Sequence, residues 1–192
     1  MLMIAALAAT AAGAKAESSY PVTVSGWLVV QRPGACAMGT DFAGPGKTYV
    51  LVQKRVNGEV ILSITNEAWS AREGEPYDVS YQLNGKEYAD GATIGYRSGA
   101  GRGFWSIMGQ GFDRDFAAGT DLSVFLDGKF IRKVSLVGTS SAIAAIDRCV
   151  ADLRTRVRSE KADNGGELPL DPFARTTSGS PARPAPGAKP RP

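Results

Sequence analysis

Short stretches rich in β-branched and aromatic residues recur along the chain, and several of them alternate between apolar and polar positions. This pattern is typical of strands with one buried and one exposed face. Asn57-Gly58, Asn84-Gly85 and Asp127-Gly128 separate several of the stretches, and such pairs favour tight hairpin turns. The pattern predicts a mainly β fold, a single antiparallel sandwich or barrel. We expect seven or eight strands, at residues 22–30, 48–55, 59–65, 77–83, 92–96, 104–108, 122–126 and 130–136.

A helical pattern follows the last predicted strand. Thr139, Ser140 and Ser141 provide hydroxyl groups that favour a helix N-terminus. The apolar residues beyond them recur at three- and four-residue steps, which places them on one helix face: Ala142, Ile146, Cys149, Val150, Leu153 and Val157. We expect one C-terminal helix packed on the sheet, and we expect Trp27 and Trp69 to lie in the core or at a corner of the fold.

The two ends of the chain differ from this central β-rich domain, which we place at residues 20–160. Residues 1–12 form an apolar run, and the small-x-small pattern Ala14-Lys15-Ala16 follows it, as in a signal peptide cleaved after residue 16. Residues 161–192 are rich in Pro, Ala and Arg and are expected to form a disordered tail. These features predict a periplasmic or secreted protein without a transmembrane segment in the mature chain.

The net charge of +3 is concentrated in the predicted tail. Arg175, Arg183, Lys189 and Arg191 follow Phe173 without any acidic residue, which leaves 18 basic against 19 acidic residues in the rest of the chain. A nearly neutral folded part does not favour binding to a polyanion. We therefore expect no nucleic-acid partner.

Two cysteines, Cys36 and Cys149, stand near the two ends of the predicted domain. An even pair in an exported chain predicts one disulfide, while two buried free thiols are the alternative. Because Cys149 lies on the apolar helix face, the bond would connect the helix to the sheet. We assign it a structural and not a catalytic role.

The candidate chemistry is limited by the absence of histidine from the sequence. This absence excludes a Ser-His-Asp triad, a Cys-His pair and His-ligated zinc, and no CxxC motif is present. We assign no catalytic residue, no cofactor and no metal ligand, and expect a protein that is not an enzyme. A hydrolase that uses carboxylates remains an alternative, although Asp113 and Asp115 in FDRDF are interpreted as part of a short polar turn.

Residues 95–105, GYRSGAGRGFW, combine glycines, arginines and aromatic residues. They match no complete dinucleotide or P-loop fingerprint, and a strand-like stretch follows them where a phosphate cradle requires a helix. We interpret them as a glycine-rich hairpin connection with outward-facing Arg97 and Arg102. The hairpin has a structural role or is a docking loop, and in the second case Arg97, Ser98 and Arg102 are the predicted binding residues.

Several motifs together resemble a family. They are Gly26-Trp27, Cys36 in CAMGTDF, Asn66-Glu67-Ala68-Trp69, and residues 136–142 followed by Cys149. In these motifs residues 22–153 resemble small exported proteins of proteobacteria, broadly similar to the invasion-associated locus B type. The resemblance implies a periplasmic β-rich domain and no catalytic residue. The function expected from it is that of an exported, non-enzymatic domain that binds a protein or another component of the bacterial envelope.

A second resemblance involves one loop. The stretch Ser98-Gly99-Ala100-Gly101-Arg102 is similar to the Ser-Gly loop with which membrane-bound inhibitors of c-type lysozyme close an active site. It implies, as an alternative function, a lysozyme inhibitor that acts through this loop.

Overall fold

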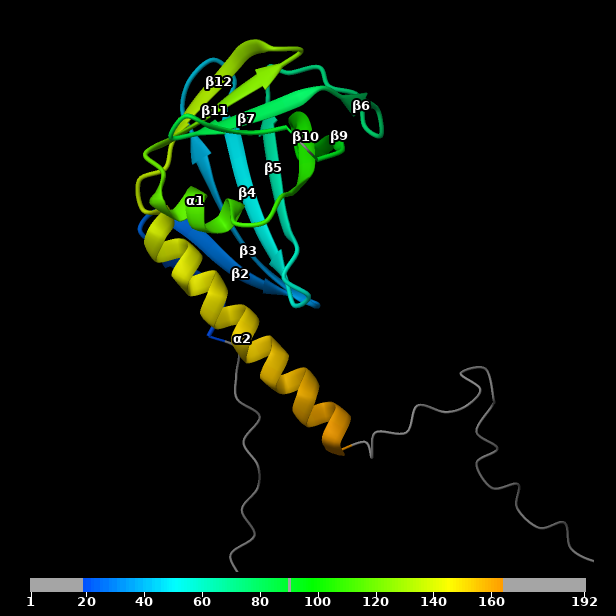
Figure 1. The fold of residues 1–192 in the computed structure, drawn as a ribbon, viewed down its shortest axis with the longest axis vertical. Coiled ribbons are helices and arrows are strands. Elements are labelled where there is room, and N and C mark those ends of the chain that lie inside the picture. Colours follow the sequence, from blue (N-terminus) through cyan, green and yellow to red (C-terminus); the bar gives the residue numbers. More distant parts are fainter. Residues whose placement is uncertain (1–18, 90, 164–192) are drawn as a thin grey trace, which may run out of the picture. The chain divides into compact units, whose positions relative to one another are not determined.

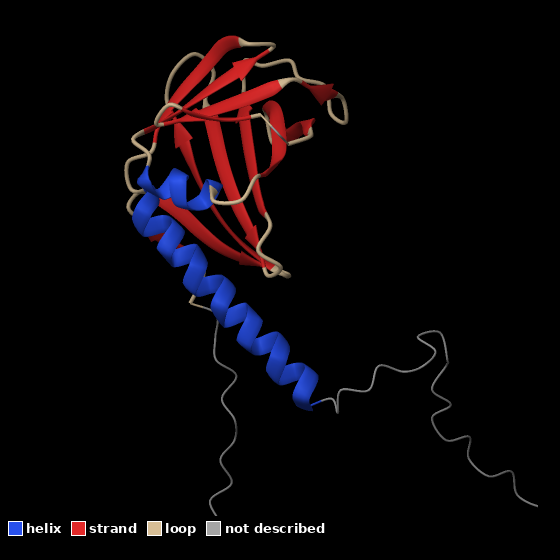
Figure 2. Ribbon diagram, in the orientation of Figure 1, coloured by secondary structure: helices blue, strands red, loops and turns tan. Residues whose placement is uncertain are grey.

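The computed structural model describes residues 19–89 and 91–163. The strands form two antiparallel sheets that face each other as a sandwich (Figures 1 and 2). The larger sheet has eight strands in the order β1-β2-β3-β4-β5-β10-β9-β6, and the smaller has four in the order β12-β11-β7-β8. The predicted mainly β sandwich with a C-terminal helix is thereby confirmed.

The strand bounds follow the hydrophobic pattern closely where apolar and polar residues alternate. They are Val22–Val24 (β1), Trp27–Arg32 (β2), Ala35–Phe42 (β3), Thr48–Arg55 (β4), Val60–Asn66 (β5), Pro76–Tyr77 (β6), Val79–Leu83 (β7), Lys86–Tyr88 (β8), Thr93–Ser98 (β9), Gly101–Met108 (β10), Asp121–Leu126 (β11) and Lys129–Ser135 (β12). The helices are Phe112–Ala118 (α1) and Thr139–Asp163 (α2). Among the described residues, those from 19 to 156 form one compact unit, and a second unit begins at Val157.

Two predicted hairpin turns have the geometry that their sequences favour. Asn84 and Gly85 have φ values of 49° and 81°, and Asp127 and Gly128 have values of 49° and 72°. Positive φ at both central residues is the conformation of a type I′ turn, which Asn-Gly and Asp-Gly adopt most readily. These turns join β7 to β8 and β11 to β12.

Three predicted elements differ from the structure. The expected strand at residues 22–30 is two strands, because Ser25 and Gly26 form a tight turn with positive φ. The strand expected at 77–83 is interrupted at Asp78, where the chain passes from the larger to the smaller sheet. The stretch FDRDF is not a turn but most of helix α1, since Phe112 and Phe116, four residues apart, are both buried on one helix face.

The core lies between the sheets and against the first part of α2. Cys36 and Cys149 form the predicted disulfide, which connects β3 to α2. Trp27 is fully buried, and its Nε1–H donates a hydrogen bond to the Val137 carbonyl at 3.1 Å. Thr139 begins α2, and its hydroxyl donates to the carbonyl oxygens of Phe116 and Leu136. The start of α2 is thus fixed to the end of α1.

The predicted apolar face of α2 is buried from Ala142 to Leu153, which confirms this part of the pattern. Val157 is 55% exposed, so its assignment to the buried face was wrong. The predicted signal peptide (1–16) and residues 164–192 of the predicted tail lie outside the described residues. Within the described ranges, neither helix is long and apolar enough to cross a membrane.

Candidate functional site

The predicted binding residues lie on the β9–β10 hairpin, whose turn consists of Gly99 and Ala100. Ser98 pairs with Gly101, and Arg97 pairs with Arg102. Because successive side chains of a strand point to opposite faces, Ser98 lies on one face of the sheet and the two arginines lie on the other. The structure thus separates the three predicted residues into two groups.

Ser98 belongs to the outer face of the eight-stranded sheet, the face directed away from the core. It lines a hollow of about 310 Å³, which we name the outer groove. The groove collects a balanced set of side chains from five strands and two loops: the tyrosines Tyr49 and Tyr96, the acids Asp41 and Glu67, the bases Arg32 and Lys47, the hydroxyl residues Thr65 and Ser98, and the apolar Leu51. Backbone of the turn at residues 99–101 completes its wall.

Strand register explains why these residues meet. Asp41 pairs with Tyr49, Tyr49 with Thr65, Thr65 with Gly103, and Gly103 with Tyr96, so one row of side chains crosses four strand boundaries. Tyr49 and Tyr96 are three strand spacings apart, or about 14 Å between their backbones. Between the tyrosines only Thr65 has a side chain, since Gly103 has none. The row therefore has one tyrosine on each side of Thr65 and Gly103, and we call these two tyrosines its aromatic ends.

Tyr49 is held in place by a neighbouring glycine. A Cβ atom added to Gly39 would overlap the Tyr49 hydroxyl, so the phenol ring lies directly over the β3 backbone. Burial raises the pKa of Tyr49, and the nearby Asp41 carboxylate raises it further. The hydroxyl therefore stays protonated at neutral pH and remains a hydrogen-bond donor.

The rim of the outer groove is tied together by polar contacts. Lys47 Nζ lies 2.7 Å from Asp41 Oδ2, and the Glu67 N–H donates to the Lys47 carbonyl at 3.2 Å. The buried amide of Asn66 fixes the adjoining loops, because its Nδ2 donates to the carbonyls of Pro45 and Gly46 and to Thr48 Oγ1. These contacts hold the backbone of both loops and place Lys47 beside Asp41 without any ligand.

Arg97 and Arg102 lie on the opposite face and are both exposed. Arg97 Nε is 3.5 Å from the Gly99 carbonyl, and neither guanidinium takes part in an ion pair within the part of the chain that the structure describes. The arginines therefore present free positive charge beside the turn.

A second hollow, of about 280 Å³, lies near the ends of the two sheets and is lined by Trp69, Tyr77 and Phe104 together with Leu126 and Ile131. The ring centroids of Trp69 and Tyr77 lie 5.6 and 5.1 Å from that of Phe104. Trp69 is partly buried against the core, at a corner of the fold as predicted. We name this hollow the aromatic pocket.

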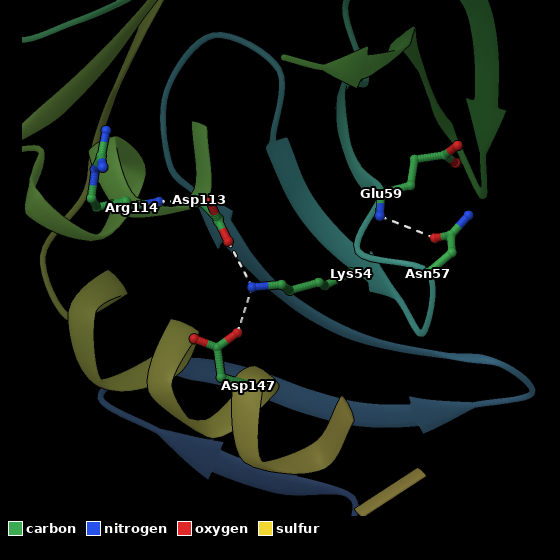
Figure 3. Close-up of polar contacts among 6 residues, drawn as sticks. All are labelled: Lys54, Asn57, Glu59, Asp113, Arg114 and Asp147. Atoms are coloured by element: carbon green, nitrogen blue, oxygen red, sulfur yellow. Dashed lines mark hydrogen bonds and ion pairs between the residues drawn. The ribbon is translucent and has the colours of Figure 1, made fainter. Parts of the chain in front are cut away.

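A charged cluster joins the sheet to both helices (Figure 3). Lys54 Nζ on β4 lies 2.6 Å from Asp113 Oδ2 on α1 and 2.7 Å from Asp147 Oδ1 on α2. Burial alone would lower the pKa of Lys54, but its hydrogen bonds to the two carboxylates give a net rise. Burial likewise favours a higher pKa for Asp113, and the bond to Lys54 reverses this, so that its pKa is lowered.

The Lys54 cluster borders a polar hollow of about 480 Å³, which Glu59 and Arg154 also line. Asn57 Oδ1 accepts a hydrogen bond from the Glu59 N–H at 3.0 Å and shapes the turn beside it (Figure 3). A lysine with a raised pKa stays charged and is a poor nucleophile. Its two ion pairs instead connect β4, α1 and α2, which is a structural role.

Sequence reasoning identified Ser98 but missed Asp41, Tyr49 and Glu67 as its neighbours in space. The available indication was that Tyr49 and Leu51 occupy the polar positions of an otherwise regular alternating strand. Among the described residues, no three Asp, Glu or Cys side chains come together as a potential metal site.

Comparison with known proteins shows that this chain has a fold similar to that of a solved structure. No protein-family model and no curated protein sequence matches the chain. Among solved structures, invasion-associated protein B from Bartonella henselae superposes with a TM-score of 0.52 at 18% sequence identity, over 71% of this chain and 99% of that one. The resemblance inferred from Trp27, Cys36 and the Asn66–Trp69 motif is thus confirmed as a weak similarity, and the chain shares its fold with this invasion-associated protein.

Proposed function

We propose that this protein is an exported, non-enzymatic binding domain of the bacterial envelope, and that the outer groove holds the envelope component. The observation that carries the proposal is the groove itself. It is a hollow of about 310 Å³ in which hydrogen-bond donors and acceptors from five strands and two loops converge. A volume of about 300 Å³ lies at the lower end of the range of small-molecule binding sites.

Two further features support the proposal. The disulfide between Cys36 and Cys149 is compatible with an oxidising compartment outside the cytoplasm. The groove is also formed by regular strands and tied loops, and sites on such elements are held in one geometry more firmly than sites on free loops. A preformed site suits binding without large rearrangement.

Co-sedimentation tests this function. The full chain is mixed with isolated membranes and with cell-wall sacculi, and the bound fraction is compared for the native protein and for Tyr96→Ala. The control is Phe130→Ala, which removes an aromatic side chain that is 58% exposed on the other sheet. We expect Tyr96→Ala to lose binding and Phe130→Ala to retain it, and we expect no soluble product to be released from either fraction. Equal binding by both variants would contradict the proposal, and product release would contradict its non-enzymatic part.

The free charge of Arg97 and Arg102 favours a second candidate, inhibition of lysozyme by the exposed hairpin. A positively charged turn without ion pairs fits an acidic cleft. The test is a lysozyme inhibition assay with the native chain and with the double variant Ser98→Ala/Arg102→Ala. The candidate requires that the native chain inhibits and that the double variant does so markedly less.

A further inference from the structure

We infer that the ligand of the outer groove is a neutral oligosaccharide; this inference rests on the proposed function and names its ligand class. It is based on three properties of the groove: its charge balance, its aromatic ends and its fixed rim.

The charge balance favours a ligand that is polar but uncharged. Asp41 and Glu67 accept hydrogen bonds, whereas Arg32 and Lys47 donate them, and the two pairs of charges cancel. An anionic ligand would meet the two carboxylates, and a cationic one would meet the two bases. A polyhydroxylated ligand satisfies both sets at once, since each hydroxyl both donates and accepts.

The aromatic ends favour a ligand with flat apolar faces. A sugar ring presents C–H groups on its faces and hydroxyls around its edge, so it stacks on an aromatic side chain while its edge forms hydrogen bonds. The backbones of Tyr49 and Tyr96 are about 14 Å apart across the row, with Thr65 and Gly103 between them. A backbone span of this length suits a short chain of sugars better than a single sugar.

Packing against Ile64 and Thr65 limits the side chains possible at Gly103 and Gly101. A Cβ at Gly103 would overlap the Ile64 carbonyl, and one at Gly101 would lie 3.0 Å from Thr65 Oγ1. Gly103 therefore excludes any larger side chain, and a larger side chain at Gly101 would require Thr65 to move. Thr65 is almost completely buried, which fixes the one side chain between the two tyrosines.

The rim is organised before a ligand arrives. The Glu67 N–H bond to the Lys47 carbonyl and the Asn66 amide hold the two loops that contribute Glu67 and Lys47, and the Lys47–Asp41 contact connects Lys47 to β3. Binding then costs little ordering of the protein, which suits ligands such as sugars that gain modest energy from each contact.

Isothermal titration calorimetry of the full chain tests the ligand class. The probes are the trimers of N-acetylglucosamine and of glucose, both neutral, and the trimer of galacturonic acid as the anionic comparison. We expect at least one neutral trimer to bind more tightly than the anionic one. Tyr96→Ala should weaken that binding by about tenfold or more through lost stacking, whereas Tyr96→Phe should stay within about threefold.

A second variant guards against misfolding of the first. Glu67 is exposed, so Glu67→Gln leaves the core untouched while replacing a charged acceptor by a neutral one. Hydrogen bonds to charged groups are the stronger ones, and we expect a loss of about tenfold in affinity. Phe130→Ala should bind as the native chain does. The inference is overturned if neither neutral trimer binds at millimolar concentration, or if both groove variants bind as tightly as the native chain.

Competition separates this inference from the proposed function. A saturating neutral trimer should release the protein from the envelope fraction to which it binds. If envelope binding depends on Tyr96 but resists every trimer, the ligand is of another class, such as an extended peptide, and only the oligosaccharide inference fails. If the protein binds no envelope fraction, the proposed function fails first.

Discussion

At the scale of single residues, the buried amide of Asn66 connects the two loops beside the outer groove. Its Nδ2 donates to two carbonyls and to Thr48 Oγ1, and its Oδ1 accepts from the Ala68 N–H at 2.7 Å. Gly46 is required opposite it, because a Cβ there would overlap Asn66 Oδ1. The motif Asn66-Glu67-Ala68-Trp69 is therefore a structural corner that also positions Glu67.

Replacing this amide should destabilise the fold. Asn66→Ala removes the donor to the buried Thr48 Oγ1 and to the carbonyls of Pro45 and Gly46, and leaves the Ala68 N–H without its acceptor, and such a loss costs about 1–3 kcal/mol. Urea unfolding followed by tryptophan fluorescence measures the effect. Asn57→Ala is the matched control, since Asn57 is exposed and accepts a single hydrogen bond. A result in which the two variants lose the same stability would contradict the role given to Asn66.

At the scale of elements, the two ion pairs of Lys54 connect strand β4 to helices α1 and α2. Two carboxylates from different helices approach one ammonium group that is 19% exposed. The stabilisation from such partly buried pairs lies between the small values of surface pairs and the larger ones of buried pairs.

Lys54→Met should therefore cost about 1–2 kcal/mol at pH 7. The lowered pKa of Asp113 means that its pairing stabilises the fold above the ordinary value of 3.8 and is lost as the pH falls through the lower, folded-state value. The raised pKa of Lys54 means that its contribution persists to about pH 10.5 and is lost as the pH rises through the folded-state value.

The measurement is urea unfolding of the native chain and the variant from acid to neutral pH. We expect the difference in unfolding free energy to be largest at neutral pH and to shrink as the pH falls below 3.8, the ordinary pKa of an aspartate, towards the lower folded-state pKa of Asp113. Lys133→Met, which removes an exposed pair with Asp121, is the control and should change stability by less than about 0.5 kcal/mol. A difference that does not vary with pH would exclude the ion pairs as its cause.

The sequence predicted those elements whose two faces differ in polarity. Strand β4 alternates, and its expected bounds agree with the structure. Strand β3 was missed because its outer positions are Ala35, Ala37 and Gly39, which are buried, so no alternation is visible. Helix α1 was missed because its seven residues give only one pair of apolar residues at helical spacing.

The candidate site could be predicted only in part for a related reason. Ser98 was identified from local sequence, because a glycine-rich turn is visible within a few residues. Tyr49 and Glu67 come close to Ser98 because β4, β5, β10 and β9 are neighbours in the sheet. This strand order cannot be predicted from any short stretch of sequence. Arg97 and Ser98 were grouped because they are neighbours in sequence, although neighbours in a strand point to opposite faces.

At the scale of the whole molecule, one covalent bond closes most of the chain into a ring. Cys36 and Cys149 are 113 positions apart and both fully buried. In the chain-entropy account, a bond across a loop of this length destabilises the unfolded state by about 4–5 kcal/mol, and measured effects range from about 2 to 5.

The double variant Cys36→Ala/Cys149→Ala should accordingly lose about 2–5 kcal/mol of stability. Urea unfolding of the native chain with and without a reductant gives the comparison. We expect the reduced native chain to unfold near the midpoint of the variant. If the reduced native chain and the double variant both unfold at the urea midpoint of the oxidised native chain, the disulfide does not stabilise the fold.

The proposed export has its own test at this scale. A signal peptide cleaved after Ala16 predicts a mature chain that begins at Glu17. Mass spectrometry of protein from the periplasmic fraction measures the N-terminus, and a gel shift on reduction reports the disulfide in the same sample. Protein found only in the cytoplasmic fraction, with residue 1 still present, would contradict the prediction.

The ring closed by Cys36 and Cys149 affects how the protein responds to cleavage by a protease. Everything from β4 to β12, including the aromatic pocket and all of the outer groove except Arg32, lies inside the ring. A single cut in any loop of that region opens the ring but releases no fragment, because both new ends remain attached through the sulfur bridge. A nicked molecule therefore keeps all its strands at high effective concentration and is able to refold around the cut.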